Sequence, residues 1–404
     1  MKINALNEEK SVSNADVNGK RVLLRCDFNV PFFDDGTISD TRRIDESLET
    51  IKFLIRKNAR VIVCSHLGRP SGKFVKELTL APVAAYLSKV LGVQVKLSQD
   101  VAGEDSRFLA SALEDGQICM IENLRFELGE EQNDREFSQQ LASLAEVYVN
   151  DAFGTCHRKH ASLVGVLEFL PGFYGFLIEK EVMGMSKILD EPKRPFISIL
   201  GGKKVSDKIE AIEGILQCVD VLMIGGGMTY TFINSLGHNV GDSICEYEKL
   251  RLAKDILLYA KEIGVKLMLP LDVRAGREYS PETESKIFST SEIPSGWQGL
   301  DIGPETTKIY AQEIEKAGTV VWNGPLGVSE WKNFSEGTFE LARAIARSDA
   351  NSIIGGGDSA EAVKRLGLSG KMTHISTGGG SSLMFLSKAQ MPGISAVMGS
   401  IRSI

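Results

Sequence analysis

Short apolar runs that end in glycines recur along this sequence, and they restrict its fold more than any other feature. In the clearest case the run 196–200 is followed by the glycine pair 201–202, after which Val205, Ile209 and Ile212 recur with helical spacing. This order predicts a buried strand, a tight turn and a helix. Unpaired N–H groups at a helix N-terminus favour an anion, so the stretch is a candidate phosphate site.

The same turn is rich in positive charge, and similar turns follow it. Lys203, Lys204 and Lys208 add three cations at the predicted helix end, although the stretch alone also fits an ordinary turn with solvated lysines. Further apolar runs of the second half end in glycine-containing turns at 225–227, 323–327, 355–357 and 378–380. Their repetition along one sheet edge suggests a backbone brought close to a nucleotide. None of them fits a P-loop or a dinucleotide-binding motif.

The first half has polar and cationic residues where its apolar runs end. The runs 21–25, 61–64, 118–121 and 147–149 alternate with helical patterns, which predicts a parallel, doubly wound sheet. The residues that follow these runs, or begin the next helix, are Asp27, Asn29, Arg43, His66, Arg69, Arg125, His157 and Arg158. Parallel topology brings strand ends to one edge, where four arginines would form a pocket for carboxylate or phosphate.

Several of these residues have a second interpretation. Asp27 and Asn29 share one face of a strand end, yet they also fit a capped turn. Asp358 is a candidate magnesium contact or the N-cap of a helix over 359–366, and both roles are compatible. The pattern C-H-x-x-H over 156–160 has metal-ligand character, but two cationic residues separate its histidines and no second ligand cluster accompanies it.

Composition limits the class of protein. A length of 404 residues favours two domains, with a junction over 172–189. The net charge of -7 argues against a nucleic-acid partner and leaves small anions as ligands. No apolar run reaches the length of about 18 residues that a membrane span needs. Six scattered cysteines without a C-x-x-C pair suggest reduced thiols, so we expect a cytoplasmic protein that is complete from residue 1.

Nine motifs, in order along nearly the whole chain, closely resemble those of phosphoglycerate kinase. They are R-C-D-F-N-V-P (25–31), S-H-L-G-R-P (65–70), E-N-L-R-F (122–126), D-A-F-G-T-C-H-R (151–158), G-G-K-K-V-S-D-K (201–208), I-G-G-G-M (224–228), W-N-G-P-L-G-V-S-E (322–330), G-G-G-D (355–358) and S-T-G-G-G (376–380).

The resemblance implies an α/β fold of two Rossmann-like, three-layer domains with mainly parallel sheets, hinged around a central cleft. It implies a phosphoglycerate-binding domain over 1–184, with 391–404 packing back onto it, and a nucleotide-binding domain over 185–390. The implied substrate-binding residues are Asp27, Asn29, Arg43, His66, Arg69, Arg125 and Arg158. The implied nucleotide-binding residues are Gly202, Lys204, Lys208, Gly226, Asn323, Glu330, Gly357, Asp358 and Ser359.

The implied reaction is glycolytic: the acyl phosphate of 1,3-bisphosphoglycerate passes to Mg-ADP, giving 3-phosphoglycerate and ATP, by in-line transfer after hinge closure. Such a transfer needs positioning and charge neutralisation rather than a strong base. We expect Arg43, Lys204 and the helix N-terminus after Gly379 to act on the transferring group, Asp358 to contact Mg²⁺, and the enzyme to be a monomer.

Alternative readings and departures from the family pattern remain. The chain could be a kinase for another small carboxylate or a silent nucleotide-binding scaffold, although Arg43, Lys204 and Asp358 are all present. Arg42 and Lys203 each add a cation beside an expected site residue. Met384 and Ser387 stand where the family usually has glutamates, so we do not expect the family's glutamate contacts near the cleft or hinge.

Overall fold

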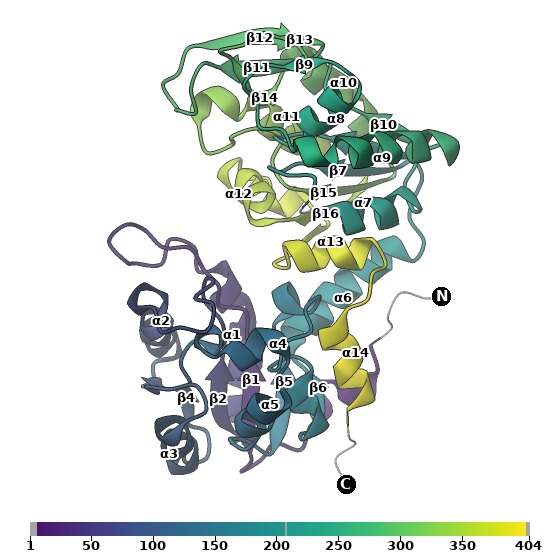
Figure 1. Ribbon diagram of the computed structural model, residues 1–404. Helices are drawn as coiled ribbons and strands as arrows, with labels where there is room; N and C mark the ends of the chain where they lie inside the picture. The colour runs from purple at the N-terminus through teal and green to yellow at the C-terminus, as the bar shows by residue number, and fades with distance from the viewer. Residues whose placement is uncertain (1–5, 207, 401–404) are drawn as a thin grey trace. The chain divides into compact units, whose positions relative to one another are not determined.

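The computed structural model describes residues 6–206 and 208–400, and these residues form two compact units (Figure 1). The N-terminal unit contains the described chain up to Met183 and again from Gln390, and the C-terminal unit contains Gly184–Ala389. The boundary at 183/184 falls inside the helix α6 (Phe176–Leu189). Each unit is built around a six-stranded parallel sheet.

The sheet of the N-terminal unit has the strand order β3-β4-β2-β1-β5-β6. Its strands are β1 (Arg21–Arg25), β2 (Arg60–Cys64), β3 (Lys96–Leu97), β4 (Ile118–Met120), β5 (Val147–Asn150) and β6 (Gly172–Tyr174). Side chains on both faces of β5 are buried, which requires helices on both sides of the sheet. Gly172–Tyr174, at the start of the predicted junction 172–189, forms the edge strand β6 beside β5, and the boundary between the units falls later in that range.

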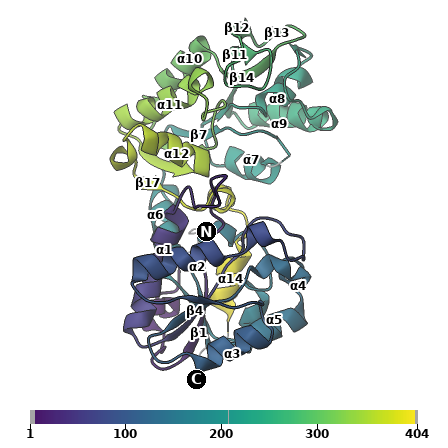
Figure 2. The same cartoon turned by 90° about the vertical axis from the view of Figure 1, so that its left-hand side faces the viewer.

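Helices cover both faces of this sheet (Figure 2). They are α1 (Arg42–Arg56), α2 (Ala81–Leu91), α3 (Glu104–Ala112), α4 (Leu128–Gln132), α5 (Arg135–Ala142) and the late helix α14 (Pro392–Gly399). Ile51 of α1 and Leu87 of α2 pack with Leu24 and Val63 in one fully buried core. On α14, the Gly393 carbonyl accepts a hydrogen bond from Asn150 Nδ2 at 3.1 Å, so the end of the described chain is tied to β5.

The sheet of the C-terminal unit has the order β10-β8-β7-β15-β16-β17. Its strands are β7 (Phe196–Leu200), β8 (Val221–Ile224), β10 (Lys266–Met268), β15 (Thr319–Asn323), β16 (Asn351–Gly355) and β17 (His374–Ile375). A smaller antiparallel sheet contains β11 (Asp272–Gly276), β12 (Ser285–Ser289) and β14 (Gln298–Ile302), and a two-stranded sheet pairs β9 (Asn239–Val240) with β13 (Glu292–Ile293).

The helices of the C-terminal unit also lie on both sides of its sheet (Figures 1 and 2). They are α7 (Ile209–Leu216), α8 (Thr229–Ser235), α9 (Leu250–Glu262), α10 (Pro304–Ile314), α11 (Glu336–Arg347), α12 (Gly357–Arg365) and α13 (Gly380–Leu386). Ile314 of α10 and Leu341 of α11 pack against Trp322 at the centre of the sheet. The α/β fold class and the predicted central strands are therefore confirmed.

Two local predictions about helix starts are wrong. The helix after the glycine pair begins only at Ile209, since residues 202–206 are not helical and Lys208 occupies the N-cap position. Asp358 does not cap α12, since Gly356 is the N-cap residue and Asp358 lies exposed in the first turn. Gly356 has a φ of 89°, a conformation that glycine adopts readily, and this lets the helix start earlier than predicted.

The core of the C-terminal unit gives a stability prediction. Leu341→Ala should lower the free energy of unfolding by about 2–5 kcal/mol, because Leu341 is fully buried and truncation leaves a cavity. Leu258→Ala is the matched control, since Leu258 is 58% exposed on α9. Tryptophan fluorescence in urea measures this unit selectively, because Trp297, Trp322 and Trp331 all belong to it. Equal losses in the two variants would contradict the described core.

Candidate active site

The register of the N-terminal sheet brings three strand ends to one level. Arg25 at the end of β1 lies opposite Cys64 on β2 and Asn150 on β5. The polar segments that follow these strands therefore leave the sheet together at its carboxyl edge. In open α/β sheets this edge is where ligands bind.

Asp27 is the point at which several predicted substrate residues meet. Its Oδ2 accepts a hydrogen bond from Arg43 Nη1 at 2.8 Å, and its Oδ1 lies 3.8 Å from His66 Nδ1. Asn29 Oδ1 accepts from the backbone N–H of Gly68 at 2.9 Å, which joins the β1 and β2 segments. A side chain at position 154 would collide with Asp27, so only glycine allows this close approach.

Arg125 and Arg158 are guanidinium groups held inside the unit. Arg125 is 3% exposed and donates from Nη1 to the Gly68 carbonyl at 2.6 Å, while its Nε forms a 3.2 Å ion pair with Glu131. Within the described residues, Nη2 of Arg125 and Nε of Arg158 are buried and have no hydrogen-bond partner. Burial and neighbouring arginines, Arg69 among them, lower the pKa of Arg158, as expected where cations crowd together.

The two histidines of this edge are neutral at physiological pH. Burial, followed by the charges of Arg25 and Arg125, lowers the pKa of His66 well below its ordinary value. Burial and the charge of Arg158 lower the pKa of His157 to about 4. Neither ring can therefore act as a cation near pH 7. The site's positive charge comes from its arginines.

Arg42, Arg69 and the C-H-x-x-H pattern have surroundings that the sequence did not indicate. Arg42 does not add an unpaired cation, because it forms a 2.6 Å ion pair with Asp40. Arg69 is exposed, and no hydrogen bond or ion pair joins it to another predicted site residue in the described chain. The C-H-x-x-H pattern is not assembled as a metal centre: Cys156 Sγ donates to the Ala152 carbonyl, and His160 Nδ1 lies 3.7 Å from Glu130.

Arg25 is a charged residue of this edge that the sequence reasoning missed. It is completely buried and hydrogen bonds to Ser162, to the Cys26 carbonyl and to His66. The signal was an arginine inside an otherwise apolar strand, where a charge is rare unless it is paired. The sequence does not show which residues pair with Arg25, because the polar residues nearest to it, Asp27 and Asn29, belong to the loop that follows the strand.

The C-terminal unit brings most of its predicted nucleotide residues together through hydrogen bonds. Lys208 Nζ donates to the carbonyl and the side-chain Oδ1 of Asn323 at 3.0 and 2.9 Å. Asn323 Nδ2 in turn donates to the Gly379 carbonyl at 3.1 Å. Ser359 Oγ accepts from Gly324 N–H at 3.0 Å and donates to the Gly355 carbonyl at 2.6 Å. The ends of β15 and β16 are thus fixed side by side.

Glycines make this edge compact. Gly226 has a φ of 68°, and a side chain there would meet the backbone of Gly202 at 2.7 Å. Gly202 itself has a φ of 127°, which residues with a side chain rarely adopt. The backbone of the 201–202 turn therefore lies against the 225–227 turn, and both present main chain rather than side chains.

Lys204 precedes two residues whose backbone is held by the side chain of Glu246. The Glu246 carboxylate accepts from the backbone N–H groups of Val205 at 2.7 Å and Ser206 at 3.1 Å. Burial alone would raise the pKa of Glu246, but a hydrogen bond from the Ser206 hydroxyl, these backbone hydrogen bonds and the charge of Lys204 lower it below its ordinary value. Lys203 and Lys204 are both exposed.

Three predicted nucleotide residues stand apart from this network. Glu330, Gly357 and Asp358 are exposed, and in the described part of the chain no hydrogen bond or ion pair joins them to another predicted site residue. The same residues contain no group of three or more His, Cys, Asp or Glu side chains that could hold a metal ion. A single exposed carboxylate nevertheless fits magnesium, which binds through one or two carboxylates plus phosphates and water.

Of the departures at 384 and 387, Ser387 lies against α7. Ser387 is buried just after α13, and its hydroxyl donates to the Met384 carbonyl at 2.8 Å. The backbone of Ser387 approaches Gly214 of α7 so closely that a side chain at 214 would not fit. Ser387 therefore joins the end of α13 to α7 within the C-terminal unit.

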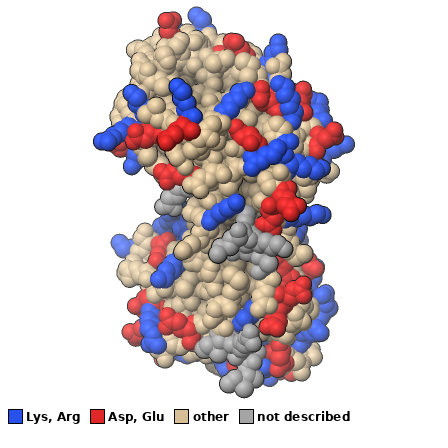
Figure 3. Space-filling view, turned by 90° about the vertical axis from the view of Figure 1, so that its right-hand side faces the viewer, with Lys and Arg blue, Asp and Glu red and all other residues tan. Residues whose placement is uncertain are grey.

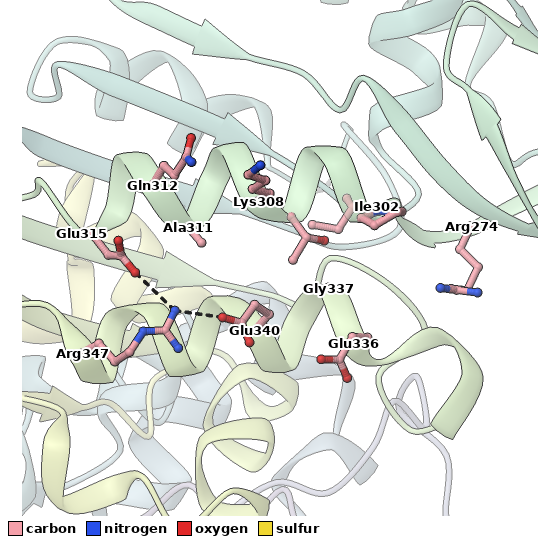
Figure 4. A pocket seen from close by; sticks show the side chains of 12 residues that line it. Arg274, Ile302, Lys308, Ala311, Gln312, Glu315, Glu336, Gly337, Glu340 and Arg347 are labelled. Carbon is pink, nitrogen blue, oxygen red and sulfur yellow. Dashed lines mark hydrogen bonds and ion pairs between the residues drawn. The ribbon is translucent and has the colours of Figure 1, made fainter.

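One cavity outside these edges lies between two helices of the C-terminal unit. A cavity of about 410 Å³ lies between α10 and α11, but its Arg347 is already bridged to Glu315 at 3.3 Å and to Glu340 at 2.8 Å (Figure 4). Acidic and basic side chains are interspersed on the face shown in Figure 3. No helix within the described residues is long and apolar enough to cross a membrane.

Fold and site together define the class of protein. One sheet edge gathers guanidinium groups, and another gathers lysine, amide and glycine backbone, all at the carboxyl ends of parallel strands. Cationic side chains and main-chain amides at such edges suit anionic ligands, and an α/β fold that carries them suits a phosphotransferase.

Comparison with known proteins gives the family. The sequence matches the family description "Phosphoglycerate kinase" over residues 12–388. It is 49% identical over 392 residues to a phosphoglycerate kinase of Clostridium tetani, covering 96% of this chain and 98% of the relative. The solved structure of phosphoglycerate kinase from Coxiella burnetii superposes with a TM-score of 0.79 at 41% identity, over 96% of this chain and 98% of that one.

A more distant structure agrees with this result. Phosphoglycerate kinase from Pyrococcus horikoshii superposes with a TM-score of 0.81 at 32% identity, over 96% of this chain and 98% of that one. The chain belongs to the phosphoglycerate kinase family and is a glycolytic phosphotransferase with a carboxyl group as acceptor.

The neutral histidines predict a dependence of stability on pH. The folded-state pKa of His157 lies below the unfolded value, so the unfolded chain takes up a proton first as the pH falls. His157 should therefore reduce the free energy of unfolding by about 2 kcal/mol between pH 7 and pH 5.

This prediction is tested by comparing urea unfolding of wild type and His157→Gln at both pH values. The variant lacks the titrating ring and should lose less stability on acidification than wild type. Other groups with shifted pKa, such as Asp151, are present in both proteins and cancel in the difference. Identical losses would mean that His157 is not held neutral.

Proposed function

We propose that the chain transfers the acyl phosphate of 1,3-bisphosphoglycerate reversibly to Mg-ADP, giving 3-phosphoglycerate and ATP. The observation that carries this proposal is that two buried guanidinium nitrogens, Arg125 Nη2 and Arg158 Nε, have no hydrogen-bond partner among the described residues. A buried cationic group is costly unless an anion pairs with it. Phosphoglycerate supplies a carboxylate and a phosphate, and both match guanidinium geometry.

The substrate side of this proposal is the N-terminal unit. We assign phosphoglycerate binding to the predicted domain 1–184, with residues 391–404 belonging to it. Its binding residues would be Asp27, Asn29, Arg43, His66, Arg69, Arg125 and Arg158. The pairing of Arg43 with Asp27 supports a role for Arg43 at the transferring phosphoryl group, because the carboxylate orients the guanidinium without burying it.

The nucleotide side is the predicted domain 185–390. Its binding residues would be Gly202, Lys204, Lys208, Gly226, Asn323, Glu330, Gly357, Asp358 and Ser359. Bound with the nucleotide, Mg²⁺ would neutralise phosphate charge, and Asp358 is the carboxylate that would hold it. The Gly379 N-cap of α13 would add backbone amides near the phosphates.

The mechanism needs no strong base. An acyl phosphate is already activated and the accepting ADP oxygen is ionised, so catalysis consists of alignment and charge neutralisation. Lys204 would bind the transferring group, and Lys208, oriented by Asn323, would bind nucleotide phosphate. Because the two substrates bind to different domains, closure must align them and exclude water. We further propose that the enzyme is a cytoplasmic monomer.

Neighbouring lysines provide a direct test. Lys204→Ala should lower kcat by about 100-fold or more, because a cation placed on the transferring phosphoryl is lost. Lys203→Ala is the matched control, since it removes an adjacent exposed lysine and should change kcat only a few-fold. Both are measured with 3-phosphoglycerate and Mg-ATP in an assay coupled to glyceraldehyde-phosphate dehydrogenase, and nucleotide binding is measured separately.

The same assay distinguishes phosphoglycerate kinase activity from the two alternative functions, a kinase for another carboxylate and a silent scaffold. Turnover of a different small carboxylate, with none of 3-phosphoglycerate, would identify another kinase. Nucleotide binding without any turnover by wild type would identify a silent scaffold. Equal losses in Lys203→Ala and Lys204→Ala would contradict the assigned role of Lys204.

A further inference from the structure

Arg25 is a fully buried cation directly beside the proposed substrate residues. It ends β1, and its guanidinium makes three hydrogen bonds inside the N-terminal unit. Nε donates to Ser162 Oγ at 3.0 Å, Nη1 donates to the Cys26 carbonyl, and Nη2 lies 3.4 Å from His66 Nδ1. The group has no direct contact with solvent, so its role is exerted through these neighbours.

The charge of Arg25 is balanced through a serine. Ser162 Oγ donates to Glu130 Oε1 at 2.6 Å, and the Ser162 N–H donates to Glu130 Oε2 at 2.9 Å. Since the Ser162 hydroxyl proton goes to Glu130, its oxygen is left to accept from Arg25. Glu130 is also fully buried, and burial alone would raise its pKa, but a hydrogen bond with His160, the charge of Arg25 and the hydrogen bond from Ser162 lower it. The carboxylate is therefore ionised.

The chemistry of arginine determines the roles at the His66 contact. A guanidinium has only donors, so Nδ1 of His66 must be the acceptor and cannot carry a proton. The alternative is an Nδ1–H that donates to Asp27, but the 3.8 Å separation is too long for a hydrogen bond. Asp27 Oδ2 is moreover bonded to Arg43 at 2.8 Å.

The ring is also neutral. His66 is 4% exposed, and burial together with Arg25, Arg125, Arg158 and Arg43 disfavours a second proton. A neutral imidazole with an accepting Nδ1 carries its one proton on Nε2.

We propose that Arg25 is a positioning residue that holds His66 in the tautomer protonated at Nε2, so that His66 meets the acid substrate as a neutral hydrogen-bond donor. The link Glu130–Ser162–Arg25–His66 fixes the direction of every hydrogen bond along it. His66 then adds a directional N–H to a site whose charge comes from arginines, and it takes no part in proton transfer. Only the identity of the substrate rests on the proposed function.

The tautomer can be measured in the wild-type enzyme. Long-range ¹H–¹⁵N correlation spectra of the ¹⁵N-labelled protein distinguish a protonated from an unprotonated ring nitrogen. The chain has only five histidines, and His66→Gln identifies the signals of His66 by their loss. We expect a protonated Nε2 and an unprotonated Nδ1 at pH 7. A protonated Nδ1, or a doubly protonated ring, would overturn the inference.

A pair of variants on the same strand tests the role of Arg25. Arg25→Lys keeps a positive charge but cannot supply both the Ser162 and the His66 contacts. It should raise the KM for 3-phosphoglycerate about tenfold, with a smaller change in kcat, and the His66 spectrum should show a mixture of tautomers. Arg21→Lys is the control, because Arg21 begins β1 and forms a more exposed pair with Glu146. An unchanged His66 spectrum in a folded Arg25→Lys would overturn the inference.

The outcomes distinguish this inference from the proposed function. Turnover of 3-phosphoglycerate together with the Nδ1-protonated tautomer would refute the role of Arg25 and leave the function standing. Absence of turnover would refute the function, while the wild-type spectrum would still decide the tautomer. If Arg25→Lys does not fold, the wild-type spectrum remains decisive.

Discussion

The structure depends on the register between parallel strands at the centre of each sheet. In the N-terminal unit, the pairing of Arg25 with Cys64 and Asn150 brings three strand ends to one level. The segments that follow must then lie together, and their cations with them. Buried carboxylates between these cations offset their repulsion. Asp27 accepts a hydrogen bond from Arg43, and Glu130 is linked to Arg25 through Ser162. Among the residues that the structure describes, the guanidinium nitrogens left without a hydrogen bond suit an anionic ligand.

In the C-terminal unit, glycine turns and their backbone occupy the sheet edge where the N-terminal unit has arginines. Its turns approach so closely that Gly226 could not carry a side chain against Gly202. Asn323 links Lys208 to the Gly379 turn, so one amide joins three segments. Main-chain N–H groups and a few lysines suit a nucleotide, because its phosphates accept many hydrogen bonds. The glycine turns also let the rest of the nucleotide lie close to the backbone. The two units thus present different chemistries at their sheet edges.

Much of this arrangement could be predicted from the sequence, because apolar runs mark the central strands and polar residues mark their ends. Asp27, Arg43 and His66 were expected at one edge, and they meet there. The start of α7 was predicted wrongly, since the spacing of Val205 and Ile209 does not reveal the bends that precede the helix. The prediction that Asp358 caps α12 was wrong because Gly356 occupies the N-cap position. The sequence alone does not show that Gly356 adopts a positive φ. Arg25 was missed because its partners, Ser162 and Glu130, are distant in sequence.

Hydrogen exchange with each ligand alone tests the central claim most directly, because the claim assigns each anion-binding edge to one substrate. We predict that 3-phosphoglycerate slows exchange in the segments 65–70, 122–126 and 151–160 and leaves the C-terminal glycine turns unchanged. Mg-ADP should slow exchange in 201–208, 225–228 and 355–359 and leave the arginine edge unchanged. Protection of the C-terminal turns by 3-phosphoglycerate alone, or of the arginine edge by Mg-ADP alone, would contradict the account.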